Sequence, residues 1–423
     1  MKDRPRSSQR QQPKFLALIA GLLVLTTALI LISPGLQTTL AWKIDEVKAY
    51  VRGAISPKGG VPAVATGSTV KEAGGVFLPG GIKEALDLPG VTATPQGRQI
   101  VAPQQVLLPP PEFDLKKDIQ DWNNCGSATL ALALRMFGWK GDQYDIADVI
   151  KPLQTDKNVN PSEMADYVAQ SGMGLSALVR VNGSADLIMD FLASGIPVIV
   201  EESFKLEQSF WPGDDLWAAH YLLITGYDRA TREWITQDSY YGPNRRIKMD
   251  LLEQTWKPFN RLVFVLYKTQ DEHMVKEILG TDWDMATNLY QAAAAAQKEI
   301  SANVKDAFAW FNLGNSLLGV KDYEGAASAF AQARQIGLPQ RMLRYQFGPF
   351  EAAYETGAID DLFLLTNYAL DRTPNSEEAL TWKGWAYILS KQDAYAKSSF
   401  QRALEAHPND AAALEGLATL QTH

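Results

Sequence analysis

The chain has 423 residues, of which 46% are hydrophobic and 21% are charged, which is more than a single hydrophobic core needs. Its formal net charge at pH 7 is −8, although residues 1–14 form a basic segment. An acidic body without a basic stripe excludes nucleic acid as the expected partner.

Residues 15–42 contain no charged side chain and follow the basic segment 1–14. An apolar stretch of this length predicts a helix that spans a bilayer. By the positive-inside rule, the basic segment stays in the cytoplasm and everything after Lys43 lies outside. A cleaved signal peptide is the alternative, but it would have a shorter apolar region, and Thr39-Leu40-Ala41 is a poor cleavage site. We therefore expect an uncleaved, single-pass membrane anchor.

Residues 43–106 are predicted to be a Gly/Pro-rich linker. After a short helix within 44–55, glycine pairs and prolines interrupt every regular pattern. We therefore expect this segment to connect distant parts of the protein without forming a hydrophobic core of its own. Residues 75–80 match half of a phosphate-binding loop, but the lysine and hydroxyl residue that should follow are absent. No nucleotide cofactor is expected.

The only cysteine, Cys125, begins a predicted helix over 125–137. We expect Asn123 or Asn124 to cap this helix by accepting hydrogen bonds from its first free N–H groups. The positive end of the helix dipole favours the thiolate, which is the nucleophilic form of cysteine. A lone cysteine beside alanine and leucine is more often core filler, so a catalytic role requires a base and an orienting group elsewhere.

The search for a base is short, because three of the four histidines lie at a domain junction or in the C-terminal helical tail: His273, His407 and His423. The fourth, His220, precedes a predicted strand at 221–226, and the chain returns as a strand at 234–237. In such a hairpin the residue opposite His220 falls within about two positions of Asp238. A carboxylate there would fix the imidazole tautomer and stabilise the imidazolium ion.

Four short motifs together resemble the bacteriocin-processing, or double-glycine-leader, cysteine peptidases and their stand-alone bacterial relatives. They are Gln120…Asn124-Cys125-Gly126, Gly195–Val200, His220–Asp228 and Gln237-Asp238-Ser239. The resemblance runs from about Leu107 to Tyr267 and implies a papain-like fold. Ser127 stands where many relatives have proline, and serine is also acceptable in a first helical turn.

The resemblance also implies roles for four side chains. Cys125 would be the nucleophile, His220 the base and Asp238 the group that orients the base. Gln120 would help to form the oxyanion hole, for which its amide must lie about 3 Å from the developing charge.

The catalytic domain, assigned to residues 107–268, is predicted to combine helices with a largely antiparallel sheet. Helices are expected at 125–137, 161–171 and 185–194, and strands at 175–181, 196–201, 221–226, 234–237 and 261–267. The aromatic residues of the loop 204–217 either line a substrate groove or pack the loop onto the domain, and both readings stay open. These aromatics are Phe210, Trp211 and Trp217.

Residues 282–423 carry a recurring pattern that matches tetratricopeptide repeats, with glycine in the first helix and phenylalanine in the second. Gly314 and Gly384 are 70 residues apart, close to two periods of about 34 with a small insertion. The intervening unit, Tyr345–Pro374, is then a degenerate repeat. Such arrays stack into all-α solenoids that bind peptides or proteins.

The predicted fold is therefore an α+β papain-like cysteine peptidase domain followed by an all-α tetratricopeptide-repeat solenoid, with an N-terminal transmembrane helix. We expect a cysteine peptidase at the cell membrane, with its catalytic and repeat domains extracytoplasmic and its repeats docking a substrate or protein partner. No HExxH or paired-cysteine pattern occurs, so no metal or other cofactor is expected. Two alternatives stay open: a catalytically silent peptide-binding or scaffold protein, and an amidase or acyltransferase with the same triad.

Overall fold

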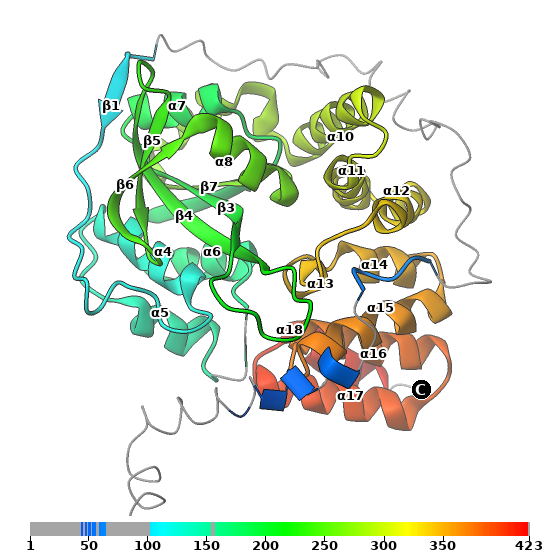
Figure 1. Cartoon of the computed structure of the whole chain (residues 1–423). Helices are drawn as coiled ribbons and strands as arrows, with labels where there is room; N and C mark the ends of the chain where they lie inside the picture. The colour runs from blue at the N-terminus through cyan, green and yellow to red at the C-terminus, as the bar shows by residue number, and fades with distance from the viewer. Residues whose placement is uncertain are drawn as a thin grey trace, which may run out of the picture. The chain divides into compact units, whose positions relative to one another are not determined.

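The computed structural model of the chain is drawn in Figure 1. It describes residues 44, 47–48, 50–51, 53–55, 59–64, 102–153, 156 and 158–421. The predicted basic segment 1–14, the predicted membrane helix 15–42 and most of the linker 43–106 lie outside the described residues. Within the described part, none of the helices has the length and apolar character needed to cross a membrane.

The chain divides into two compact units, one made of Met1–Pro57 with Phe210–Pro212 and the other of Lys58–Ser209 with Gly213–His423. In the first unit, the described residues within 44–55 are helical, as the sequence predicted. Large apolar side chains of this helix are exposed: Ile44, Val47, Tyr50, Val51 and Ile55.

In the part of the chain that the structure describes, seven strands form one antiparallel sheet. The strands are β1 (Gln105–Leu107), β2 (Leu175–Arg180), β3 (Val198–Lys205), β4 (Trp217–Asp228), β5 (Glu233–Asp238), β6 (Gly242–Lys248) and β7 (Val263–Lys268). Their order is β2-β7-β3-β4-β5-β6, and β1 pairs with the end of β4. The long strand β4 therefore lies at the centre of the sheet and carries His220.

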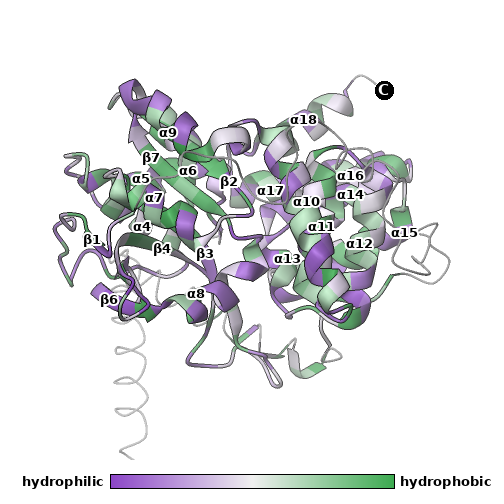
Figure 2. Cartoon of the chain, turned by 90° about the horizontal axis from the view of Figure 1, so that it is seen from above, coloured by the Kyte–Doolittle hydropathy of each residue, from purple (hydrophilic) through white to green (hydrophobic). Residues whose placement is uncertain are grey.

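Both faces of the sheet are buried, because successive side chains point to opposite sides and helices cover each side. In β3, Val198 and Val200 belong to one hydrophobic core, while Ile199 belongs to the other. The first core includes residues of α7 (Ala185–Ala193), α8 (Met249–Trp256) and α9 (Glu272–Leu279). The second includes residues of α4 (Cys125–Arg135), α5 (Gln143–Ile150) and α6 (Pro161–Gln170). Figure 2 shows the resulting hydrophobic colour along β7.

All five predicted strands are present as β2, β3, β4, β5 and β7, and the three helices predicted in this domain correspond to α4, α6 and α7. Strand β6 was missed because its sequence, GPNRRIK, contains proline and charged residues. Burial on both faces explains why the central strands read as continuous apolar runs rather than as alternating patterns.

The C-terminal part is helical and, in Figure 1, forms successive helix pairs. Its helices are α10 (Met285–Ala302), α11 (Ala307–Gly319), α12 (Tyr323–Ile336), α13 (Met342–Tyr345), α14 (Gly348–Glu355), α15 (Ile359–Arg372), α16 (Glu377–Leu389), α17 (Asp393–Ala406) and α18 (Ala411–Thr419). A Cβ atom on Gly314 would lie 2.6 Å from the ring of Phe330, and one on Gly384 would lie 2.5 Å from the ring of Phe400. The recurring glycine thus lets the first helix of each pair approach the aromatic ring of the second.

A segment of the predicted linker, residues 59–64, lies against this helical part. Val61 is 4% exposed and belongs to the hydrophobic core of the helices. Arg334 donates to the carbonyl oxygens of Pro62 at 2.7 Å and of Ala63 at 3.0 Å. The expectation of a linker without core contacts does not hold here, because its backbone carbonyls satisfy a buried guanidinium.

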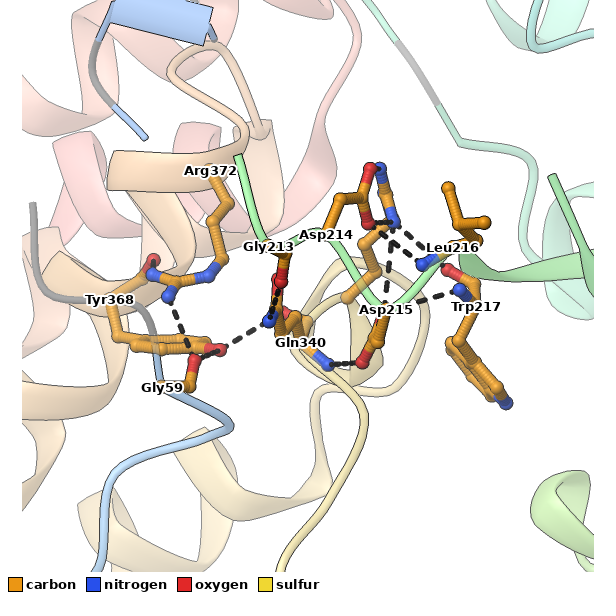
Figure 3. Close-up of polar contacts among 10 residues, drawn as sticks. Gly59, Gly213, Asp214, Asp215, Leu216, Trp217, Gln340, Tyr368 and Arg372 are labelled. Carbon is orange, nitrogen blue, oxygen red and sulfur yellow. Dashed lines mark hydrogen bonds and ion pairs between the residues drawn. The ribbon is translucent and has the colours of Figure 1, made fainter. Parts of the chain in front are cut away.

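The same segment takes part in the network drawn in Figure 3, where Tyr368 and Arg372 both donate to the carbonyl oxygen of Gly59. Tyr368 also donates to the carbonyl oxygen of Gln340 at 3.1 Å. The Gln340 backbone N–H in turn donates to Asp215 at 2.7 Å. The network therefore ties the linker segment to the loop before β4 through the helical part.

Packing also decides the role of Trp217 in the 204–217 loop. Its ring stacks on Phe259 with a centroid separation of 5.6 Å, and it meets the ring of Tyr345 edge-on at 5.9 Å. Next to it, Arg341 forms an ion pair with Asp214 in which both side chains are buried. The structure supports the packing alternative for Trp217, whereas Phe210 and Trp211 belong to the other unit.

Candidate active site

Helix α4 begins at Cys125 and is held tightly against the sheet. Residues 126–134 are all buried, and the Thr129 hydroxyl donates to the carbonyl oxygen of Tyr221 at 3.1 Å. A Cβ atom on Gly126 would lie 2.7 Å from the side chain of Val159, so this position accepts only glycine without rearrangement. The helix start is therefore fixed between β4 and the segment that carries Val159.

The predicted asparagine cap of α4 is wrong. Asn124 occupies the N-cap position but makes no side-chain capping bond. Its amide instead donates to the side chain of Gln143 at 2.8 Å, and the same Gln143 oxygen accepts from the Asp121 N–H at 2.9 Å. Asn123 has a left-handed backbone with φ of 54°. The loop before Cys125 is thus shaped by a buried glutamine that the sequence pattern did not reveal.

The β4–β5 hairpin brings His220 and Asp238 together, as its predicted register required. Leu223 lies opposite Gln237, and continuing this register places position 240 opposite His220, two residues from Asp238. The His220 Nε2 atom lies 3.0 Å from Asp238 Oδ1, and both side chains are almost fully buried. This pair is the imidazole–carboxylate contact expected from the sequence.

Asp238 is held by donors besides His220. Its Oδ1 atom accepts from the N–H groups of Tyr240 at 2.8 Å and Tyr241 at 3.1 Å, and its Oδ2 atom accepts from Arg245 at 2.8 Å. Burial acts to raise the pKa of Asp238. The hydrogen bonds and the charge of His220 outweigh burial and lower this pKa below its ordinary value, to about 2. The carboxylate is therefore ionised and rigid at neutral pH.

The electrostatics of the site favour an ion pair between Cys125 and His220. Burial acts to raise the pKa of the Cys125 thiol, but its interaction with His220 and the charge of Lys151 lower it below the ordinary value. Burial acts to lower the pKa of His220, whereas Asp238 and Cys125 raise it to about 10. A thiolate at Cys125 and an imidazolium at His220 would therefore stabilise each other.

The second ring nitrogen of the histidine, His220 Nδ1, is buried and makes no hydrogen bond to nitrogen or oxygen within the described residues. It is the nitrogen left to exchange a proton with the thiol, because Nε2 is engaged by Asp238. The ring of Phe204 packs against the imidazole at a centroid distance of 5.4 Å, and that of Tyr240 at 6.4 Å. These rings restrict the imidazole to one orientation.

Gln120 lies beside this pair rather than in a described contact with Cys125. Its backbone N–H donates to the carbonyl oxygen of Ser239 at 2.7 Å, and its side-chain oxygen accepts from the Ser239 hydroxyl at 2.9 Å. Within the described residues its Nε2 group donates no hydrogen bond. The side chain is thus fixed through its oxygen and keeps a donor available.

Two further groups contact the loop before Cys125, a third interacts with the charge of Cys125, and all three were missed in the sequence. Lys151 donates to the carbonyl oxygen of Asn123 at 2.8 Å, and Arg344 donates to the Asn123 side chain at 2.7 Å. Glu201, on β3, is buried, and burial together with the charge of Cys125 raises its pKa well above the ordinary value. Arg344 could not have been found by local spacing, because it comes from α13 in the helical part.

A hollow of about 350 Å³ lies elsewhere, lined by residues of α7, β5 and α8 that include Met189, Trp234 and Trp256. It contains none of the four candidate site residues. Among the described residues, the arrangement around Cys125 is the one that combines a thiol, an imidazole, a buried carboxylate and a side-chain amide.

Part of the chain matches a known protein family. Residues 104–264 match the Peptidase_C39 like family. No curated protein sequence matches the chain.

Three solved structures match parts of the chain at low sequence identity and low TM-score. One is a Bacillus anthracis protein described as C39-like peptidase, with 14% identity, a TM-score of 0.30 and coverage of 39% of this chain and 98% of that chain. A second is the peptidase domain of Streptococcus ComA, a bifunctional ABC transporter involved in quorum sensing, with 17% identity, a TM-score of 0.26 and coverage of 38% and 96%. A third is YrrB, a TPR protein with an unusual peptide-binding site, with 16% identity, a TM-score of 0.19 and coverage of 32% and 86%. The resemblance drawn from the sequence is confirmed: residues 104–264 match the Peptidase_C39 like family, and a helical region follows them.

Proposed function

We propose that this chain is a cysteine peptidase that hydrolyses peptide bonds with Cys125 as nucleophile, His220 as acid and base, and Asp238 as the orienting group. The observation that supports this proposal is the buried contact of His220 with Asp238 beside a thiol whose pKa is lowered. A structural cysteine in an apolar core would have its pKa raised instead.

In the proposed mechanism, the Cys125 thiolate attacks the carbonyl carbon of the scissile bond and forms a tetrahedral oxyanion. Gln120 Nε2, which keeps a free donor, and the backbone N–H of Cys125 stabilise that oxygen. The His220 imidazolium gives its proton to the leaving amine, and a thioester remains on Cys125. His220 then takes a proton from water, the water attacks the thioester, and the acid product leaves as the thiolate is restored. Asp238 holds the ring through both steps.

We further propose a papain-like fold for residues 107–268 and a tetratricopeptide-repeat solenoid for residues 282–423. The matching Gly–Phe packing in two helix pairs supports the repeats. We place both domains outside the cell membrane on a single-pass anchor at residues 15–42, for which the uncharged sequence and the preceding basic segment are the support. The repeats would dock a peptide or protein substrate or partner.

The single cysteine allows a direct test, because a thiol-directed reagent can label only Cys125. We expect iodoacetamide to label the native protein rapidly near neutral pH and His220→Ala to slow this labelling strongly. His273→Ala is the matched control, because His273 is exposed and remote from the site. Labelling that occurs only after unfolding would refute the proposed nucleophile.

Hydrolysis itself is tested with a peptide library and mass spectrometry. We expect cleavage products with the wild-type protein and none with Cys125→Ala, whose thermal midpoint should stay within a few degrees because one sulfur atom contributes little packing. Labelled, folded protein that leaves every peptide intact but hydrolyses or transfers simple amides would favour the amidase or acyltransferase alternative.

A further inference from the structure

A group of buried acids meets His407 at a place remote from Cys125. One oxygen of Asp156, one oxygen of Glu377 and one ring nitrogen of His407 lie within 4.8 Å of one another. Asp156 is 1% exposed and Glu377 is 4% exposed, while the His407 side chain is 12% exposed. The three residues come from the segment after α5, from the first turn of α16 and from the end of α17.

Two of these acids have oxygens that the protein does not satisfy. In the described part of the chain, Glu377 Oε2 is buried without any hydrogen-bond partner. Asp156 Oδ2 accepts no hydrogen bond of ordinary geometry either, and its close neighbour is His407 Nδ1 at 3.1 Å. Buried, unpartnered carboxylate oxygens are costly, so these atoms require a proton or a cation.

Two neighbouring carboxylates make the charge imbalance larger. Glu163 Oε1 lies 3.8 Å from His407 Nδ1, and its other oxygen accepts from the Asn160 N–H at 2.7 Å. Glu378 accepts from Asn158 Nδ2 at 3.1 Å and is satisfied locally.

Among the described residues, fewer positive groups than acids are found at this place. Within the part of the chain that the structure describes, His407 is the basic group in direct contact with the acids, through Nδ1 and Asp156 Oδ2. Lys151 also interacts with Asp156, but its ammonium group donates to the Asn123 carbonyl oxygen. Asp410 adds a further negative charge near His407.

We propose that Asp156, Glu377 and His407 bind one divalent transition-metal cation, with Zn²⁺ as the preferred ion. Two carboxylate oxygens and one imidazole nitrogen are donors that Zn²⁺ accepts, whereas Ca²⁺ and Mg²⁺ prefer oxygen alone. With metal–ligand bonds of about 2.1 Å, neighbouring ligand atoms around Zn²⁺ lie about 3–3.5 Å apart. The separation of 3.1 Å between Asp156 Oδ2 and His407 Nδ1 fits this value. Glu163 or a water molecule would complete the coordination.

The cation would fasten Asp156, and with it residues 158–160, to the helical part. This segment also forms the wall behind the start of α4, since Val159 packs against Gly126 and its carbonyl oxygen accepts from the Tyr221 hydroxyl at 3.0 Å. The site is therefore structural, and its occupancy would stabilise the position of the helix that begins at Cys125. It would hold together residues far apart in the sequence: Asp156, Glu377 and His407.

The test uses the full-length chain in detergent, without a polyhistidine tag and with Cys125→Ala so that the thiol cannot bind metal. After treatment with a chelator, Zn²⁺, Mn²⁺ and Ca²⁺ are titrated separately, with calorimetry and the thermal midpoint as readouts. We expect one Zn²⁺ per chain, a rise in the midpoint on binding, and weaker binding of Ca²⁺.

Three variants decide whether the binding is at the proposed site. Glu377→Gln and His407→Gln should each weaken Zn²⁺ binding by at least about tenfold. Glu405→Gln, an exposed acid two residues from His407, should leave it unchanged. If Glu377→Gln does not fold, His407→Gln provides the same comparison.

Three results would overturn the proposal: no stoichiometric binding, equal affinity in both ligand variants and the control, or binding of Ca²⁺ in preference to Zn²⁺. A further refuting result is a Glu377→Gln protein that is more stable than the parent in chelator while no cation shifts either midpoint. That outcome would assign the cluster to a protonated Glu377 paired with its neighbours.

Discussion

Replacing Asp238 with asparagine should narrow the pH range of activity from both sides. The pKa of His220 is raised from 6.5 to about 10, which corresponds to about 5 kcal/mol in favour of the imidazolium. Asp238 and the Cys125 thiolate share this effect, so we assign about 2–3 kcal/mol to Asp238. The asparagine amide would also point a donor at Arg245 or at His220, where the carboxylate accepts from both.

The expected result for Asp238→Asn follows from the sign of these effects. A raised pKa keeps His220 protonated up to about pH 10, so the alkaline limb of the kcat/KM profile of the wild type should lie near that pH. In the variant this limb should fall by about two pH units, because about 2–3 kcal/mol of stabilisation is lost. The acid limb should move to higher pH, because a less stable imidazolium stabilises the thiolate less and the pKa of the thiol rises. At the optimum, kcat should fall about 30- to 150-fold with little change in KM.

The assay is the pH dependence of peptide hydrolysis for the wild type, Asp238→Asn and the surface control Asp250→Asn. Asp250 lies on an exposed helix start, so its change should leave the profile in place. An unchanged alkaline limb in Asp238→Asn, with an increase in KM alone, would mean that Asp238 is a structural residue and that the ion-pair reasoning is wrong.

Two more predictions concern the helical part. Arg344→Met removes the donor to Asn123, which lies two residues before Cys125. We expect kcat to fall about tenfold, because the nucleophile is less well positioned, while KM and the thermal midpoint change little. Steady-state kinetics and a thermal melt would test this. Arg334→Met removes the guanidinium that pairs with the buried Asp361 and donates to the carbonyl oxygens of Pro62 and Ala63, so it should lower the free energy of unfolding in urea by about 3–5 kcal/mol.

The parts of the site that the sequence predicted are those fixed by local geometry. Cys125 starts a helix because of the apolar run that follows it, and His220 and Asp238 meet because two adjacent strands determine their register. Both inferences need only the helical or strand period and one short turn. The roles of these residues, and that of Gln120, stay predictions until activity is measured.

The parts that the sequence did not predict depend on contacts between distant segments. Asn124 does not cap the helix, because its side-chain amide donates to the side-chain oxygen of the buried Gln143 instead. No spacing rule marks Gln143 as a partner. Arg245 escaped notice because β6 lacks an apolar pattern. His407 was set aside as a residue of the helical tail, although folding brings its imidazole to Asp156.

The docking of residues 59–64 on the helices would, under the proposed anchoring, limit how far the proposed enzyme can lie from a bilayer. If the whole span 43–106 were free, about 64 residues could extend to roughly 220 Å. Because Val61 is buried and Gly59 is bound, only about 16 residues, 43–58, remain between the proposed anchor and the first fixed point. Their contour length is at most about 55 Å. Under the proposed anchoring, the catalytic centre would work in a shallow layer above the lipid and would act on substrates that enter this layer, rather than searching the surrounding compartment.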